Sequence, residues 1–428
     1  MTEHTTVVDL SYGDAGKGSV VDWLCSPVAR MEGRPVHAVV RFNGGAQAAH
    51  RVVSADGRQH VFSQFGSGTF WPGVQTHLSR FVLVEPLALA AEAEHLATLG
   101  IEAPLARITV DRRALLTTPY HRAANRAREV ARGNDRHGSC GVGIGETMAF
   151  AIDHPEDTPV VGDAETPSVL RAKLNRLRDR LVDELGDLDA PSVEQVVEAF
   201  GAFATRVALV DERELTHLLR TGPVVFEGAQ GVLLDEWRGF HPYTTWSTTT
   251  FDNAEVLLDE SGCTDGAVRL GVLRTYTTRH GAGPFVTEDP ALTADLPDSH
   301  NGLNHWQGAF RVGHFDAVAH RYAVEVAGGV DGVALTHLDV AAARTDLQVC
   351  DAYEIDGDLV DRIEPGPFRD LDYQAELTVR LLRAKPVCRP PGAPWAETVT
   401  DLLGTPVVLA SHGPGPGDKQ LLRSPVRA

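Results

Sequence analysis

Short runs of apolar, mostly β-branched residues recur along the chain, and each run ends at a turn that carries Gly, Thr or His. Runs of this kind, bounded by turn residues, predict strands that are buried on both faces of a sheet. We expect buried strands at residues 5–10, 36–42, 223–226, 267–273, 332–335 and 406–409.

Helical spacing of apolar residues is found between these strands. The clearest case is 167–185, where leucines recur at 170, 174, 177, 181 and 185. Thr166 is the expected N-cap and Pro167 fits the first turn. A second helix is expected to begin over 19–24. The leucine stripe is interpreted as packing and not as a functional surface.

Strands that alternate with helices predict an α/β fold around a mostly parallel central β-sheet. Ligands of such sheets bind at the carboxyl ends of the strands, so the polar clusters that follow the strands should converge on one site. Because the chain shows neither repeats nor a low-complexity linker, one large domain over residues 1–428 is the simplest organisation.

Composition narrows the function classes. The chain has 428 residues, 43% of them hydrophobic, but no apolar run long enough to span a membrane and no evident secretory signal. A net charge of −19 disfavours nucleic acid and anionic membranes as partners. Five scattered cysteines without C-x-x-C spacing are typical of reduced thiols in the cytoplasm and disfavour a zinc site.

The first polar cluster, residues 12–19 (YGDAGKGS), follows the first expected strand directly. Glycines let backbone N–H groups approach a phosphate, and the helix that follows adds its positive end. Lys17, one of only four lysines in the chain, is placed to neutralise phosphate charge. Asp14 has no place among phosphates unless it binds a cation or takes a proton. A plain glycine-rich turn with one solvated lysine is an equally compatible interpretation.

Five more polar clusters follow. They are residues 41–50, 138–145, 226–231, 276–285 and 335–339. His50 closes the first of them after a Gly-Gly turn, although a lone histidine is more often structural than catalytic. The loop 138–145 suits closure on an anion or a simple surface turn. Asp339, after a buried strand, offers a carboxylate that can accept two hydrogen bonds from a guanine edge.

In this order and spacing the clusters resemble the adenylosuccinate synthetase family, from Val8 to about Gly413. GDAGKG at 13–18 resembles the family's GDEGKG, and FEGAQG at 226–231 matches it outright. YTTRHGAGPF at 276–285 resembles YTTRVGAGPF. THLDV at 336–340 stands where the family has TKLDV, and SHGP at 411–414 resembles STGP.

The resemblance implies a homodimeric, P-loop-NTPase-related α/β fold that uses GTP and Mg²⁺. Asp14 would deprotonate N1 of an IMP-like purine and ligate Mg²⁺ together with Ala49. The purine O6 would attack the γ-phosphate of GTP, with His50 and Lys17 stabilising the transfer. An amino acid or another amine would then displace phosphate from C6.

The resemblance also implies two sets of binding residues. For GTP these are Gly13, Gly16, Lys17, Gly18, His337, Asp339, Ser411 and Gly413. For the substrates they are Gln47, Ser139, Cys140, Gln230, Thr245, Arg279 and Arg311, with Gln230 on the purine and Thr245 on its 5′-phosphate.

Several departures from the family fall at substrate contacts. GGHNAGH has become GGAQAAH at 44–50, GTTGRGIG has become GSCGVGIG at 138–145, and Trp246 replaces a serine. An arginine that in the family reaches the partner subunit's substrate phosphate falls near His154.

The largest departure is the loop that holds aspartate in the family. A run rich in arginines is replaced by WQGAFR at 306–311, where only Arg311 remains. Two carboxylates need more than one guanidinium in a partly desolvated site. We therefore expect aspartate to be a poor co-substrate, unless Arg279 or Arg274 compensates; Trp306 and Phe310 favour a smaller or less charged amine.

Three hypotheses remain open. The chain is a housekeeping enzyme acting on IMP and aspartate, a diverged ligase in specialised metabolism with another nucleotide, nucleoside or amine, or a non-catalytic nucleotide-binding regulatory protein. Retention of Asp14, Lys17 and His50 together argues against the third.

Overall fold

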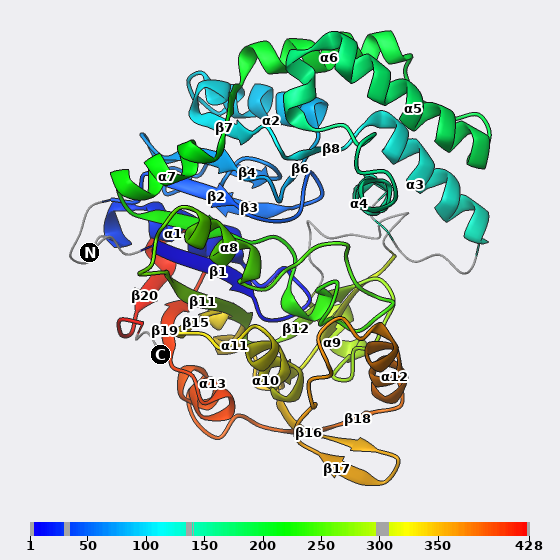
Figure 1. Cartoon of the computed structure of the whole chain (residues 1–428). Coiled ribbons are helices and arrows are strands. Elements are labelled where there is room, and N and C mark those ends of the chain that lie inside the picture. Colours follow the sequence, from blue (N-terminus) through cyan, green and yellow to red (C-terminus); the bar gives the residue numbers. More distant parts are fainter. Residues whose placement is uncertain (1–3, 30–34, 134–138, 140, 297–307, 426–428) are drawn as a thin grey trace.

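The computed structural model describes residues 4–29, 35–133, 139, 141–296 and 308–425. A ten-stranded sheet crosses the middle of the molecule (Figure 1). Its strands are, in spatial order, β20 (Lys419–Leu421), β19 (Val407–Ser411), β15 (Gly332–Thr336), β11 (Ala267–Arg274), β1 (His4–Asp9), β10 (Val224–Glu227), β2 (Ala38–Arg41), β5 (Gln75–Leu78), β7 (Ile108–Asp111) and β9 (Ala208–Val210).

All neighbours in this sheet run parallel except β20, which pairs antiparallel with β19. The mostly parallel sheet and all six predicted strands are confirmed. The strands β5, β7 and β9 were not predicted. The sequence of β5, Gln75-Thr76-His77-Leu78, is too polar to be identified as buried, yet His77 is buried and bonds Thr109 of β7 at 2.9 Å.

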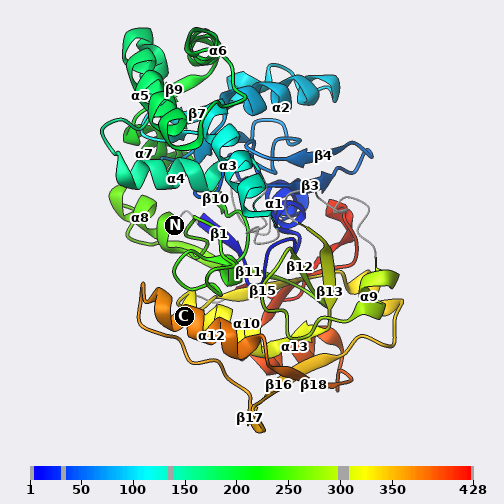
Figure 2. The same cartoon turned by 90° about the vertical axis from the view of Figure 1, so that its right-hand side faces the viewer.

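Helices connect most of the strands of this sheet. Figures 1 and 2 place α5 and α6 at one end of the molecule and β16–β18 at the other. The helices are α1 (Lys17–Cys25), α2 (Pro86–Thr98), α3 (Pro119–Arg132), α4 (Ile144–Asp153), α5 (Pro167–Leu185), α6 (Val193–Arg206), α7 (Glu212–Thr221), α8 (Asp252–Glu260), α9 (Pro290–Asp295), α10 (Ala317–Val326), α11 (Leu338–Ala342), α12 (Leu371–Leu381) and α13 (Trp395–Leu403).

Shorter sheets complete the fold. They contain β3 (His50–Val53) with β4 (Gln59–Phe62), β6 (Leu83–Val84) with β8 (Leu115–Leu116), and β12 (Thr277–His280) with β13 (Phe310–Gly313). A further sheet contains β14 (Phe315–Asp316), β16 (Val349–Ile355), β17 (Asp358–Val360) and β18 (Lys385–Arg389). None of the described helices has both the length and the apolar character of a membrane span.

The predicted helix 167–185 is confirmed as α5, and its leucine stripe packs as expected. Leu170, Leu174, Leu177 and Leu181 are buried in one core with α3 and α6, whereas Leu185 is only partly buried. Thr166 occupies the N-cap position, but its side chain makes no capping hydrogen bond. The predicted N-cap position of Thr166 is therefore confirmed, and its backbone carbonyl accepts from Leu170 N at 3.1 Å.

The parallel direction of the strands brings the predicted clusters together. The loops after β1, β2, β10, β11, β15 and β19 all leave the carboxyl ends of adjacent parallel strands, so they share one edge of the sheet. The predicted convergence on this edge is confirmed.

Candidate active site

The loop after β1 is organised by Asp9, which the sequence analysis did not single out. Its Oδ1 accepts from the Ser11 backbone N–H at 2.9 Å, and its Oδ2 accepts from Ala15 N–H at 2.8 Å. Gly13, Asp14 and Gly16 all have positive φ, at 96°, 60° and 99°. The chain therefore folds tightly and enters α1 at Lys17, whose first N–H groups are available to an anion.

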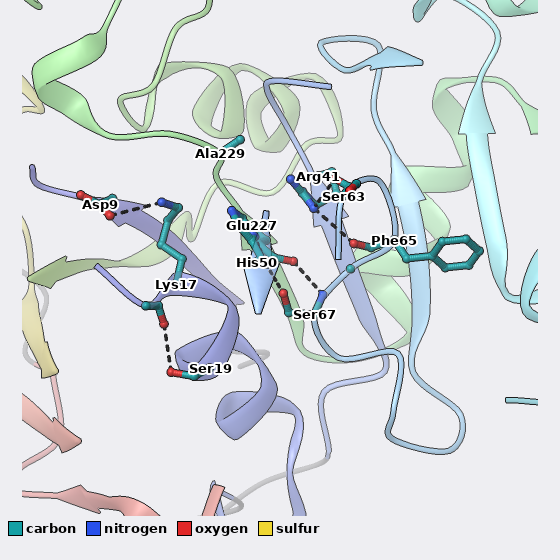
Figure 3. Close-up of polar contacts among 12 residues, drawn as sticks. Asp9, Lys17, Ser19, Arg41, His50, Ser63, Phe65, Ser67, Glu227 and Ala229 are labelled. Atoms are coloured by element: carbon teal, nitrogen blue, oxygen red, sulfur yellow. Dashed lines mark hydrogen bonds and ion pairs between the residues drawn. The ribbon is translucent and has the colours of Figure 1, made fainter. Parts of the chain in front are cut away.

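Lys17 is turned toward the protein interior (Figure 3). Its ammonium donates to the Gln230 carbonyl at 2.6 Å and to Asp9 Oδ2 at 3.3 Å, and the residue is only 4% exposed. These bonds tie the phosphate-type loop to the segment after β10. A contact between Lys17 and a phosphate therefore requires the side chain to turn away from Asp9 and Gln230.

His50, at the start of β3, forms a buried pair with Glu227 at the end of β10 (Figure 3). The Nδ1–Oε1 distance is 2.6 Å, and Glu227 also accepts from the Ser67 hydroxyl and backbone N–H at 2.5 and 2.9 Å. Burial would raise the pKa of Glu227, but the charge of Arg41 and the contact with His50 hold it at about 2.

The protonation states of this pair follow from its surroundings. Burial lowers the pKa of His50 by more than Glu227 raises it, so the imidazole is neutral at neutral pH. Because the Glu227 carboxylate can only accept, Nδ1 carries the proton and Nε2 keeps its lone pair. A phosphoryl group arriving at Nε2 would favour proton uptake there, with Glu227 stabilising the imidazolium. Glu227 lies within the FEGAQG motif but was not predicted as a site residue.

Asp14 contacts His280, at the end of β12. The distance between His280 Nε2 and Asp14 Oδ2 is 3.1 Å. Burial would raise the pKa of Asp14, but the hydrogen bond from His280 and the charges of His280, Arg274 and Lys17 lower it below its ordinary value. Asp14 is therefore a carboxylate at neutral pH, which fits a base or a metal ligand. His280 was not predicted as a site residue. The feature of the sequence that could have identified it is the replacement of the family's valine by histidine in the motif at 276–285.

The residues at this edge fit Mg²⁺, because this ion is usually held by one or two protein carboxylates together with oxygens of the substrate phosphates. Asp14 supplies an ionised carboxylate. Ala49 precedes His50, whose backbone lies so close to Gly18 that a Cβ there would come 3.1 Å from the His50 carbonyl carbon. Glycine at position 18 thus lets the loop 13–18 and the segment 49–50 face each other.

A cavity of about 620 Å³ opens beside this edge. Its lining includes His280 and five of the predicted substrate residues, namely Gln47, Ser139, Gln230, Thr245 and Arg279. Gln230 donates to the Thr245 hydroxyl at 2.7 Å. Cys140, Trp306 and Gln307 lie outside the described residues.

Arg311 and Arg279 are occupied by the protein itself. Arg311 pairs with Glu288 at 2.7 Å and donates to the Gly281 carbonyl at 2.6 Å. Arg279 donates to the carbonyls of Ala282, Pro284 and Tyr243, and its guanidinium lies 4.3 Å from the Tyr12 ring centre. Both side chains brace the turn at 281–284, and Arg311 does not line the cavity. The structure thus gives no support to the expectation that Arg311 binds substrate or that Arg279 compensates for the lost arginines.

The predicted guanine residues lie at the ends of β15 and β19. His337 has a φ of 59° and precedes α11, which contains Asp339 and contacts β19. Thr336 Oγ1 donates to the Ala15 carbonyl at 2.7 Å, so this strand end is tied to the loop 13–18. Ser411 Oγ donates to the Gly413 carbonyl at 3.1 Å. The residues predicted to bind the phosphates and the base of GTP therefore lie along one continuous edge.

A family model described as adenylosuccinate synthetase matches residues 6–379. The adenylosuccinate synthetase of Myxococcus xanthus is 31% identical over 99% of this chain and 100% of its own. The chain belongs to the adenylosuccinate synthetase family. The fully ligated adenylosuccinate synthetase of Plasmodium falciparum shares the fold, with a TM-score of 0.83 and 20% identity over 98% of this chain and 100% of that one.

A second solved structure shares the fold. The succinoaminodeoxyadenylate synthetase of cyanophage S-2L, bound to dGMP and dATP, aligns with a TM-score of 0.63 and 19% identity over 99% of this chain and 96% of its own. Adenylosuccinate synthetases are purine-biosynthesis ligases. Membership of the family therefore makes this protein a ligase that forms a C–N bond with GTP and Mg²⁺.

Proposed function

We propose that the protein transfers the γ-phosphoryl group of GTP to the 6-oxygen of an IMP-like purine, and that an amine then displaces the phosphate. The observation that carries this proposal is the meeting of three features at one sheet edge. They are the Asp14 carboxylate, the His50–Glu227 pair and the loop 13–18. Beside them lies a cavity in which both amide atoms of Gln47 and the Oε1 of Gln230 are buried without a partner among the described residues.

The proposed reaction has two balanced steps. Asp14 takes the proton from N1, O6 forms a bond to the γ-phosphorus and GDP leaves. The amine nitrogen then bonds to C6, the C6–O bond breaks, phosphate leaves with the former O6, and the amine loses a proton. Lys17, His50 and Mg²⁺ would neutralise the transferring phosphoryl group, as phosphoryl transfer relies on positioning and charge.

An isotope experiment that traces the 6-oxygen of the purine tests this proposal. With a 6-¹⁸O-labelled hypoxanthine compound, GTP, Mg²⁺ and an amine panel, the released phosphate should carry ¹⁸O in proportion to the 6-amino product formed. Unlabelled phosphate would show plain GTP hydrolysis and would refute the proposal. Absence of any GTP turnover would favour the non-catalytic alternative.

A diverged substrate is the second candidate, and the engagement of Arg311 by Glu288 favours it. The cyanophage protein of the same fold binds dGMP, so the fold accommodates a purine nucleotide other than IMP. We further propose a cytoplasmic homodimer, on the family relationship alone. Light scattering at micromolar concentration tests the dimer, and a monomer would contradict it.

Asp339 should set the preference for GTP over ATP. Its carboxylate can accept from guanine N1–H and N2–H, whereas adenine offers no such donor pair and would leave the charge unpaired. Replacing Asp339 by Asn should weaken GTP binding by about 10- to 100-fold, the range for hydrogen bonds to a charged group. Calorimetric titration with GTP and ATP checks this, and tighter binding of ATP to the unaltered protein would contradict it.

A further inference from the structure

The arginines that line the cavity already have partners. Arg128 of α3 donates to both oxygens of Glu184, at 2.6 and 2.8 Å, and to Glu146 at 3.1 Å. Arg132 pairs with Glu129 at 2.6 Å. Arg279 donates from all three nitrogens to backbone carbonyls. Within the described ranges, no guanidinium of the cavity lining lacks a partner.

Three carboxylates line the same cavity: Glu129, Glu146 and Glu236. The Glu129 side chain is fully buried, and its Oε2 has no partner among the described residues. Glu236 accepts from the Thr248 hydroxyl at 2.7 Å, and no ion pair is found for it in the described chain. Glu146 lies in the first turn of α4, where its carboxylate compensates the partial positive charge of the helix N-terminus. This end of the helix is therefore less able to attract a negatively charged ligand.

Two glutamine amides of the cavity also offer free hydrogen-bonding atoms. Gln47 has both amide atoms, and Gln230 its Oε1, buried without a partner in the described structure. Trp246, which is 48% exposed, lies over Gly145 at the start of α4. Trp237 and Tyr243 add further aromatic surface. This lining suits a flat ring and hydroxyl groups.

His154 stands near the position that the resemblance assigns to a phosphate-binding arginine. His154 ends α4, and its ring packs on Phe150 of the same helix with the ring centres 5.0 Å apart. An imidazole ring held against its own helix lacks the planar fork of donors with which a guanidinium binds phosphate.

We infer that the acceptor carries no phosphate on its sugar end and is a 6-oxopurine nucleoside or a similarly uncharged relative. A phosphate dianion would lose its hydration beside carboxylates, and each described guanidinium of the cavity lining is already paired or hydrogen-bonded within the protein. The inference rests on the proposed function, and it replaces the 5′-phosphate contact expected for Thr245 with the observed bond from Gln230.

Calorimetric binding of inosine and IMP tests the inference, with Mg²⁺ and a non-hydrolysable GTP analogue present throughout. Inosine should bind at least about tenfold more tightly than IMP, because a close like-charge contact costs that much or more in a partly buried site. Equal or tighter binding of IMP overturns the inference, and so does failure of both probes to bind at millimolar concentration. If inosine binds but releases no ¹⁸O-phosphate, the proposed function fails and this inference stands.

A pair of variants checks the cause. Glu236→Gln removes one cavity charge with little change of shape and should move the inosine-to-IMP affinity ratio severalfold toward IMP. Glu165→Gln is the matched control, since Glu165 is exposed and paired with Arg112 away from the cavity. An unchanged ratio in Glu236→Gln, or an equal change in the control, overturns the charge explanation.

Discussion

Asp14→Asn should lower the rate of ligation by at least about 10²-fold, the lower end for loss of a general base. The carboxylate that would take the N1 proton and bind Mg²⁺ is lost, whereas the backbone is preserved. Asn is the suitable replacement because Asp14 has a φ of 60°, which Asn tolerates and Ala does not. Single-turnover phosphate release measures the effect, and GTP binding should be largely retained.

Asp356→Asn is the matched control for Asp14→Asn. Asp356 has a φ of 55° in the turn between β16 and β17 and pairs there with Arg383, so the chemical change and the backbone conformation are the same. Its activity should equal that of the unaltered protein. Near-normal turnover of Asp14→Asn, or equal losses in the two variants, would show that the proposed role of Asp14 is wrong.

Aspartate should be a poor amine donor, at least about tenfold less efficient than a matched neutral amine, because each missing charged hydrogen bond costs about 1.5–3 kcal/mol. Arg311, the one arginine kept in this loop, pairs with Glu288 and braces the carbonyls of Gly281 and Gly283. Its neighbour Phe310 lies beside His280, across the β12–β13 pair. These contacts leave an apolar and weakly polar surface where the family offers guanidinium groups.

Asparagine is the matched comparison for aspartate, since it has the same shape without the side-chain charge. Release of labelled phosphate is measured with aspartate, asparagine, alanine and simple amines. Asparagine and alanine lack only the side-chain carboxylate, and simple amines lack both, so the series separates the effects of the two carboxylates. Efficient turnover with aspartate at or below millimolar concentration would contradict the prediction and favour the hypothesis of a housekeeping enzyme that acts on IMP and aspartate.

The sequence by itself determined the strands whose apolar runs are uninterrupted and the order of the polar clusters along the chain. Because the strands are parallel, each cluster that follows a strand had to reach the same sheet edge, so the nucleotide loop, His50 and Asp339 could be predicted together. The strand β5 could not, since Thr76 and His77 are polar residues buried only by their neighbours in the sheet.

The tertiary structure alone decided which side chains meet. His50 and Glu227 are 177 positions apart, and Lys17 reaches the Gln230 carbonyl over 213 positions. The contacts of Asp14 with His280 and of Arg311 with Glu288 are likewise invisible in any local pattern. The protonation state of a buried ionisable group depends strongly on its nearest charged or hydrogen-bonding partner. Strand order and register determine which residue that partner is. The same motif residues therefore acquire their protonation states and their freedom to bind substrate only in the folded chain.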